Sequence, residues 1–173
     1  MEERRVTSRD IRPATVADLP DIMSVLEAAR GIMRSDGNML QWADAYPSEQ
    51  VIRHDMARGA GYVICPDGRV VAYFAFLPSP EPTYSFIDGA WLDAHRPYHV
   101  IHRIGSLPDV HGVFDAMMEF AFAADGNIRI DTHRDNHIMQ HNILKHGFTY
   151  CGIIFLESGD ERLAYQKVTE DSY

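Results

Sequence analysis

One stretch of the sequence, from 98 to 148, constrains the fold more than any other. A β-branched run at 99–106 leads into a short loop with one glycine, Gly112, and then into a helical apolar pattern. A second strand pattern at 128–130 and a second helical pattern follow, and Gly147 ends that helix. Free backbone N–H groups at a helix start point toward an anion, so this strand–glycine–helix order can hold a pyrophosphate.

The rest of the chain also alternates between strand and helix patterns, which favours a mixed α/β (α+β) sheet with helices on both faces. The pattern predicts, in chain order, a strand at 10–14, a helix opened by the capping pattern at 15–18, a helix at 48–58, a hairpin of 62–65 and 70–77, a short strand at 85–87, and a final hairpin of 148–156 and 162–168. We expect a single domain over 10–168, a flexible N-terminal tail at 1–9, either disordered or weakly docked, and a C-terminal tail at 169–173.

The charge of the chain limits its partners. Lys plus Arg number 16 and Asp plus Glu number 25, which gives a formal net charge of −9. Nucleic-acid binding needs clustered positive charge, so we expect no nucleic-acid partner, and an acidic surface favours cationic acceptors such as amines. No apolar run approaches membrane-spanning length, and the N-terminus has no signal-peptide core, so we expect no membrane association and a cytoplasmic location.

Three features of the stretch described first carry a resemblance to a known family. The run HVIHRIGS at 99–106 looks like the family's fourth strand, which lies against the cofactor's pantetheine arm. The segment DVHGVF at 109–114 stands in the place of its pyrophosphate loop. Asn136-x-x-Met139, followed by KHGF at 145–148, is similar to its pattern after the fifth strand. Over residues 10–168 the chain resembles the GNAT superfamily of acetyl-CoA-dependent N-acetyltransferases.

The resemblance implies a fold and an activity. The fold is a mixed, mostly antiparallel central sheet of about six to seven strands, flanked by about four helices and splayed between strands 4 and 5. The activity is transfer of an acetyl group from acetyl-CoA to a primary amine of a small molecule or peptide, by direct attack. His137 and His141 have a zinc-binding spacing, but no third ligand is evident and we expect no metal. A homodimer is left open.

The sequence also departs from the family pattern. Of the pyrophosphate loop only Gly112 remains: Asp109 stands where a basic or amide residue is common, and Phe114 where a small residue is common. Ile143 occupies the place of the family's frequent acid, a tyrosine. Two alternatives therefore stay open, a degenerate acyl-CoA-binding protein without catalysis and an interaction protein that binds no CoA.

The resemblance places the acetyl-CoA donor along the strand, the glycine loop and the following helix. Gly112 brings the backbone close to phosphate, the alternative being an ordinary turn glycine. The expected donor-binding residues are Ile104, Gly105, Ser106, Val110, His111, Gly112, Val113, Phe114, Asp115, Asn136 and Met139.

The resemblance makes His102 the expected general base, because some amine-acetylating members of the family use a histidine at this strand position, and an imidazole can take an ammonium proton near neutral pH. Strict alternation puts His102, Ile104 and Ser106 on one face of the strand and Arg103 on the other, where we expect a salt bridge under a helix. The competing interpretation of His102 is a hydrogen-bonded histidine packed in the sheet. Tyr84 is a candidate for the general acid or for the wall of the acceptor site, and water is the alternative acid.

The resemblance implies that the acceptor lies beside the loop between the first two helices, which borders the acceptor site in the family. Gln41, Trp42 and Tyr46 would supply an apolar wall with polar tips, unless they only pack the loop down. Asp88 could bind a cationic amine or serve as a turn aspartate. Asp131, Thr132 and His133 lie at the carboxyl end of a strand, where ligand crevices of α/β sheets open, although helix capping by Thr132 or Asp135 is the plainer account.

Overall fold

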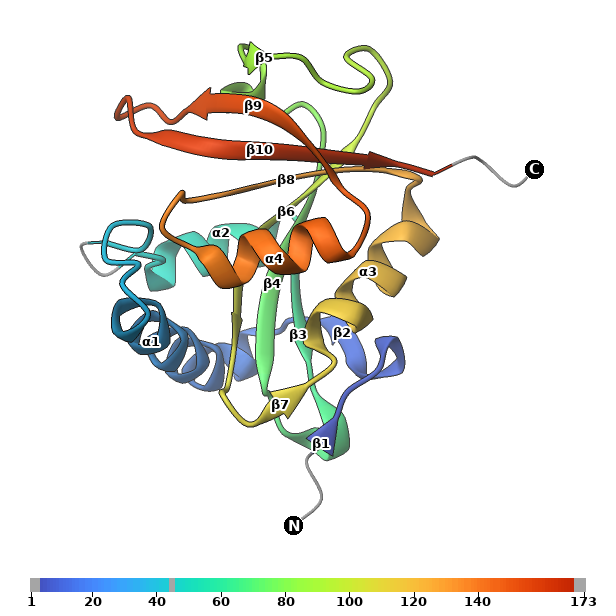
Figure 1. Cartoon of the computed structure of the whole chain (residues 1–173). Helices are drawn as coiled ribbons and strands as arrows, with labels where there is room; N and C mark the ends of the chain where they lie inside the picture. Colours follow the sequence, from blue (N-terminus) through green and yellow to red (C-terminus); the bar gives the residue numbers. More distant parts are fainter. Residues whose placement is uncertain (1–3, 44–45, 170–173) are drawn as a thin grey trace.

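A computed structural model describes residues 4–43 and 46–169 of the chain (Figure 1). Its helices are α1 (Leu19–Ser35), α2 (Glu49–Ala57), α3 (Val113–Ala124) and α4 (His137–Lys145). Its strands are β1 (Arg4–Arg5), β2 (Ile11–Pro13), β3 (Gly61–Ile64), β4 (Ala72–Pro78), β5 (Asp88–Gly89), β6 (His99–Ser106), β7 (Val110–His111), β8 (Asn127–Thr132), β9 (Thr149–Phe155) and β10 (Glu161–Val168).

Eight of the strands form one sheet in the order β2-β3-β4-β6-β8-β10-β9-β5. All neighbours in it are antiparallel except β6 and β8, which run parallel. The mixed, mostly antiparallel fold is confirmed, but the sheet has eight strands instead of six to seven. One strand that adds to the expected number is β5, a two-residue edge strand that pairs with β9. It is too short to show an alternating pattern of apolar and polar residues. It lies at Asp88–Gly89, after the strand expected at 85–87.

Two helical layers cover the sheet, as the alternation of side chains along β3 and β4 requires. Val63 and Tyr73 pack with α1 and α2 in one buried cluster. The next residues along these strands, Ile64 and Phe74, pack with α3 and α4 in another. Figure 1 shows α1 and α2 together on one side of the sheet and α3 and α4 on the other. Within the described ranges, none of the helices is long and apolar enough to cross a membrane.

The ends of the helices follow the capping patterns in the sequence. The carboxylate of Asp18 accepts hydrogen bonds from the N–H and hydroxyl of Thr15 just before α1 begins. The guanidinium of Arg12 on β2 donates to the same carboxylate and lowers the pKa of Asp18 to about 2. At the start of α4, Asn136 Oδ1 accepts from the Met139 N–H at 3.0 Å. These contacts fix where α1 and α4 begin.

The N-terminal segment differs from the flexible tail expected at residues 1–9. Of the part that the structure describes, β1 pairs in parallel with β7, and the Val6 N–H donates to the carbonyl of His111 at 2.9 Å. Val6 is only 2% exposed and belongs to the core beside α3. One apolar residue among charged neighbours gives no periodic signal, so the sequence did not distinguish docking from disorder here. Thr169 bonds to Gly126 at the other end of the chain, and residues 1–3 and 170–173 lie outside the described residues.

Candidate active site

The two central strands of the sheet pair at one end only. β6 and β8 are joined by three residue pairs, from His99 with Ile128 to Ile101 with Ile130. Past these pairs the strands separate: Figure 1 shows β8, β9 and β10 crossing the top of the view, while β3 and β4 run steeply below them. The splay predicted between these two strands is confirmed.

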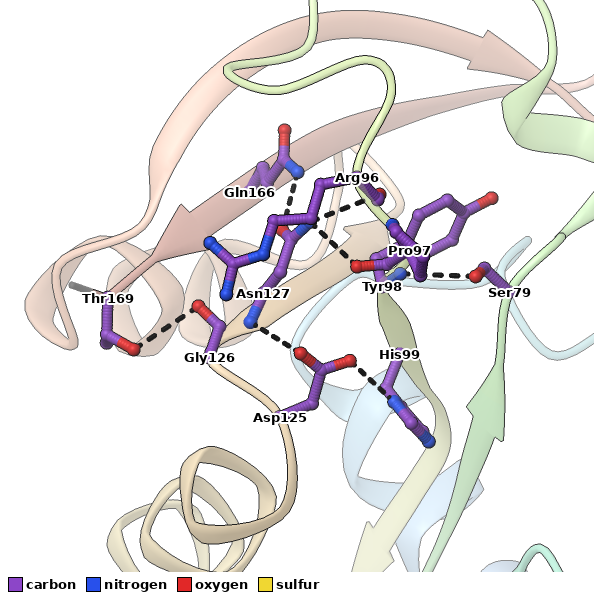
Figure 2. Close-up of polar contacts among 10 residues, drawn as sticks. All are labelled: Ser79, Arg96, Pro97, Tyr98, His99, Asp125, Gly126, Asn127, Gln166 and Thr169. Atoms are coloured by element: carbon purple, nitrogen blue, oxygen red, sulfur yellow. Dashed lines mark hydrogen bonds and ion pairs between the residues drawn. The ribbon is translucent and has the colours of Figure 1, made fainter. Parts of the chain in front are cut away.

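Polar contacts hold the paired end together (Figure 2). Asn127 Nδ2 donates to the carbonyl of Pro97 at 3.1 Å, and its Oδ1 accepts from Gln166 Nε2 at 2.7 Å. His99 Nδ1 lies 2.7 Å from Asp125 Oδ2 in the same cluster. Asn127 and Gln166 are fully buried, so these bonds are sheltered from water and tie β6, β8 and β10 together. The opening at the other end of β6 is therefore a fixed feature of the sheet.

A β-bulge lies in β6 where it leaves β8. Its register against β4 shifts between Tyr73, paired with Gly105, and Ala75, paired with His102, so β6 carries one extra residue here. Arg103 has a φ of 54°, a left-handed conformation that is uncommon for a residue other than glycine. The bulge breaks the alternation of side chains, and His102 and Arg103 line the same cavity. The expectation that they face opposite sides is wrong.

Arg103 is anchored by a buried ion pair. Its Nε and Nη2 donate to the two carboxylate oxygens of Asp55 on α2, at 2.8 and 2.5 Å. Asp55 is 1% exposed and also accepts a hydrogen bond from the Tyr73 hydroxyl at 2.7 Å. Burial opposes the charge of Arg103, but Asp55 and Tyr46 outweigh it and raise the pKa of Arg103 above its ordinary value. The predicted salt bridge under a helix is confirmed.

A cavity of about 670 Å³, the donor cavity, lies between α1, β6, the turn from β7 to α3, and α4. Cavities of this size commonly hold small molecules. Every residue expected to bind the donor lines it, namely Ile104, Gly105, Ser106, Val110, His111, Gly112, Val113, Phe114, Asp115, Asn136 and Met139.

The turn into α3 gives this cavity an anion-binding end. Gly112 has a φ of 83°, and a Cβ on it would lie 2.9 Å from the carbonyl oxygen of Val6. The turn therefore requires glycine both for its backbone angle and for the close approach of the N-terminal segment. The N–H groups of Val113 and Phe114, in the first turn of α3, have no acceptor within the helix. Both residues lie on the cavity wall, where their N–H groups can bind an anion.

The carboxylate at this helix start is paired with two bases. Asp115 accepts from Arg5 Nη2 at 2.8 Å and lies 2.5 Å from His146 Nε2. The hydrogen bond with His146, with a further contribution from Arg5, lowers the pKa of Asp115. Arg5, Lys145 and His146 all line the donor cavity, whereas Asp109 is exposed and outside its wall. Besides His111 of the loop itself, basic groups near the turn therefore come from β1 and the end of α4.

A second cavity of about 630 Å³, the acceptor cavity, adjoins the first. The two share the wall formed by Met33, Ile104, Asn136 and Met139, so they meet where β6 leaves β8. The predicted acceptor residues that line this second cavity are Gln41, Trp42 and Tyr46, together with the predicted base His102. Trp42 also packs in the core beside α1, which is the packing role considered for it, and its contact with the acceptor stays a prediction.

His102 lies between two carboxylates in the acceptor cavity. Its Nε2 is 3.5 Å from Glu81 Oε1, and its Nδ1 is 3.8 Å from Asp131 Oδ2. The contact with His102 lowers the pKa of Glu81. Asp131 is held in place by the Tyr84 hydroxyl, which donates to its Oδ2 at 2.5 Å. The site therefore offers a base flanked by negative charge.

A chain of three amides links the two cavities. The backbone N–H of Met139 donates to Asn136 Oδ1, so Asn136 Nδ2 is the atom that faces Gln41 Oε1, at 3.0 Å. The same Gln41 oxygen accepts from Asn38 Nδ2 at 2.9 Å. The orientation of all three amides follows from one backbone donor. Among the described residues, no donor reaches Asn38 Oδ1, which is buried beside the donor cavity.

Three predicted residues lie elsewhere. Tyr84 is 2% exposed and lines neither cavity; burial, and then Asp131, raise the pKa of Tyr84 well above its ordinary value. It is therefore a support for Asp131 and is not placed to be the acid. Asp88 is exposed on β5, where it pairs with Ile153 at the sheet edge. His133 lines a neighbouring cavity of about 410 Å³, and burial lowers the pKa of His133.

The sequence did not single out several residues that complete the site. Glu81 lies in a proline-rich loop without periodicity, and only tertiary folding brings it to His102. Arg5 belongs to the segment expected to be a tail. Asp131, by contrast, was indicated together with His133, because it lies near the carboxyl end of a strand, where ligand crevices open.

Comparison with known proteins gives a family. No family model matches the sequence, and no curated protein matches it. Among solved structures, a GNAT-family acetyltransferase from Streptococcus agalactiae 2603 shares 32% identity, covers 93% of this chain and 95% of its own, and has a TM-score of 0.83. A GNAT-family acetyltransferase from Listeria monocytogenes 4b F2365 shares 18% identity over 92% and 94%, with a TM-score of 0.65.

A ribosomal-protein-alanine N-acetyltransferase from Brucella melitensis shares 19% identity over 92% of this chain and 99% of its own, with a TM-score of 0.57. This likeness and the one to the Listeria protein concern the fold alone. The Streptococcus agalactiae protein is similar in sequence as well, over nearly the whole of both chains. The splayed strands, the glycine turn and this similarity lead to one conclusion: the chain belongs to the GNAT family and is an acyltransferase.

Proposed function

We propose that the protein transfers an acetyl group from acetyl-CoA to a primary amine by direct attack of the amine on the thioester. The meeting of the donor and acceptor cavities at the splay of β6 and β8 carries this proposal. Two reactants held on either side of one opening react without a covalent enzyme intermediate. Proximity and orientation can then supply a large part of the rate enhancement.

The donor cavity has groups suited to the pyrophosphate and to the pantetheine arm of acetyl-CoA. The N–H groups of Val113 and Phe114 and the side chains of Arg5 and Lys145 would take the pyrophosphate and its charge. Asn38 Oδ1, buried without a donor among the described residues, suits an amide N–H of the pantetheine arm. This orphaned acceptor is the best sign that the cavity is built for a ligand with amide groups.

The acceptor cavity suits an amine that arrives as an ammonium ion. Glu81 and Asp131 attract the cation, and His102 between them takes its proton, either directly or through water. Asp131 keeps its orientation because Tyr84 donates to it. The neutral amine then lies in the cavity that opens onto the thioester.

The bulge in β6 supplies the remaining group. A bulge leaves the ladder locally unpaired, and the bulge in β6 adjoins Ile104, on the wall that both cavities share, so we infer a free backbone N–H there. Such an N–H would donate to the thioester oxygen as negative charge develops on it. Arg103, fixed by Asp55, holds the backbone in this conformation.

Calorimetric titration with acetyl-CoA, CoA and adenosine 3′,5′-bisphosphate tests the donor half. We expect micromolar binding of acetyl-CoA and weaker binding of the fragment that lacks the pantetheine arm. Absence of acetyl-CoA binding at millimolar ligand would contradict the proposal.

Release of free thiol from acetyl-CoA, with spermidine and 2-phenylethylamine as acceptors, tests the transfer half. His102→Gln should lower kcat by about a hundred-fold or more, because the base is lost while the side chain keeps a similar size. His95→Gln, at an exposed histidine outside both cavities, is the matched control. Tight donor binding with no acetyl transfer to a wide panel of primary amines would favour the degenerate acyl-CoA-binding protein instead.

A further inference from the structure

The direction of the hydrogen bond at the Tyr46 hydroxyl can be assigned. Tyr46 lies between α1 and α2, is 38% exposed and lines the acceptor cavity. Arg103 Nη1 lies 3.2 Å from its oxygen, and a guanidinium can only donate, so the Tyr46 oxygen is the acceptor in this hydrogen bond. The O–H proton of Tyr46 must then point elsewhere. No acceptor within residues 4–43 and 46–169 takes it.

Arg103 is held in a way that fixes the place of this hydroxyl. Two of its nitrogens bind the buried carboxylate of Asp55, which Tyr73 also contacts. Its backbone is the left-handed residue of the β6 bulge. A non-glycine residue with positive φ persists only where its surroundings enforce it, and such residues concentrate at functional sites. The guanidinium of Arg103 therefore fixes the position of the Tyr46 oxygen.

We propose that Tyr46 is the general acid that protonates the sulfur of the departing CoA, with Arg103 as its positioning residue. This rests on the proposed acetyl transfer. When the carbon–sulfur bond breaks, its electron pair goes to sulfur. The Tyr46 O–H bond breaks in the same step, its proton forms the S–H bond, and the negative charge left on the Tyr46 oxygen faces Arg103. A solvent proton then restores the hydroxyl.

The proton balance of the whole reaction closes with this step. The ammonium substrate gives up two protons in becoming an amide, and His102 passes both toward solvent. Tyr46 delivers one proton to sulfur and regains one from solvent. The net products are the acetylated amine, CoA with a protonated thiol, and one proton.

The other tyrosine considered for this role is not placed for it. Tyr84 is buried, and its proton is already donated to Asp131. Of the described tyrosines, Tyr46 is the one that lines the donor or the acceptor cavity.

Tyr46→Phe tests the proposal through turnover. With spermidine as acceptor, kcat should fall by about a hundred-fold, within the range of general acid–base contributions. The KM for acetyl-CoA should stay within about two-fold, because the change removes a proton donor used only when the bond breaks. Tyr150→Phe, at an exposed tyrosine on β9 outside both cavities, should leave kcat and KM unchanged.

A binding comparison that needs no acceptor supplies a second readout. At about pH 9 a thiol of ordinary pKa is mostly ionised, and the Tyr46 O–H can donate to the thiolate of bound CoA. Calorimetry should show CoA affinity about ten-fold lower for Tyr46→Phe than for the wild type, the size expected for a hydrogen bond to a charged group. Affinity for desulfo-CoA should be the same for both, since it has no sulfur to accept the bond.

The outcomes separate this inference from the function on which it rests. If the wild type neither binds acetyl-CoA nor releases thiol, the proposed function fails. If the wild type binds CoA but Tyr46→Phe keeps both its turnover and its preference for CoA over desulfo-CoA, Tyr46 is not the acid and the proposed function stands. Loss of affinity for both ligands would show that Tyr46 only packs the loop, which also overturns the inference.

Discussion

Gly112 shows at the residue scale how one position serves the fold and the donor cavity together. Its φ of 83° and the Val6 carbonyl, 2.9 Å from where a Cβ would stand, both exclude a side chain. Gly37 has nearly the same φ, 87°, but a Cβ on it would have nothing within 4 Å. A comparison of substitutions at Gly37 and Gly112 therefore separates the cost of the backbone conformation from the cost of a steric clash.

We therefore expect Gly37→Ala to destabilise the fold by about 1 kcal/mol, the cost of a left-handed backbone with a Cβ. Gly112→Ala should cost about 2 to 3 kcal/mol, because the turn or the N-terminal segment must also move. Movement of the turn displaces the N–H groups at the start of α3, so acetyl-CoA affinity should fall by about ten-fold or more in Gly112→Ala alone. Chemical denaturation and calorimetry measure the two effects, and equal losses in both variants would contradict the close-contact interpretation.

The residues that line the donor cavity could be predicted from sequence because they lie close together along the chain. They come from three short segments, 104–106, 110–115 and 136–139, each next to a strong strand or helix pattern. The acceptor cavity draws on segments far apart in the chain, and its polar groups Glu81, Asp131 and Arg162 have no common local signal. Three of five predicted acceptor residues line that cavity, and Asp88 and His133 lie outside it.

At the scale of elements, β6 shows why alternation alone is an incomplete guide. Its residues 99–106 were predicted as a strand from β-branched residues, and the structure has the strand with these bounds. The bulge at Arg103 has no signature in the sequence, since it depends on Asp55 from α2 and on the register against β4. An extra residue in one strand puts neighbouring side chains on one side, which is how His102 and Arg103 come to share a cavity.

The docked N-terminal segment gives a prediction at the same scale. Val6→Ala removes two buried methyl groups from the core beside α3 and should destabilise the fold by about 2 kcal/mol, or lower Tm by about 4 to 8 °C. Val16→Ala, at a valine that is 62% exposed, is the control and should leave Tm unchanged. If both variants had the same Tm, Val6 would contribute nothing to stability, and the flexible tail expected at residues 1–9 would be the better description.

On the scale of the whole molecule, the net charge of −9 and the lining of the acceptor cavity act in the same direction. The lining carries the carboxylates Glu81, Asp131, Glu157 and Asp160, and it also carries two guanidinium groups, Arg103, which is paired with Asp55, and Arg162. A cavity whose lining has an excess of one sign of charge raises the local concentration of an oppositely charged substrate. The molecule should therefore capture polycationic amines better than monocationic ones.

Salt screens this attraction, which makes it measurable. Between about 20 and about 300 mM NaCl the KM for spermidine should rise by about three-fold or more, whereas that for 2-phenylethylamine should change by less than about two-fold. Neutralising two exposed carboxylates on the lining, in Glu157→Gln/Asp160→Asn, should flatten the dependence for spermidine and leave kcat unchanged, because neither residue contacts His102. Glu49→Gln, an exposed carboxylate on α2 outside both cavities, should keep the wild-type dependence. Equal flattening by Glu49→Gln would assign the effect to net charge alone, and the same salt dependence for both amines would mean that the carboxylates of the cavity do not select by charge.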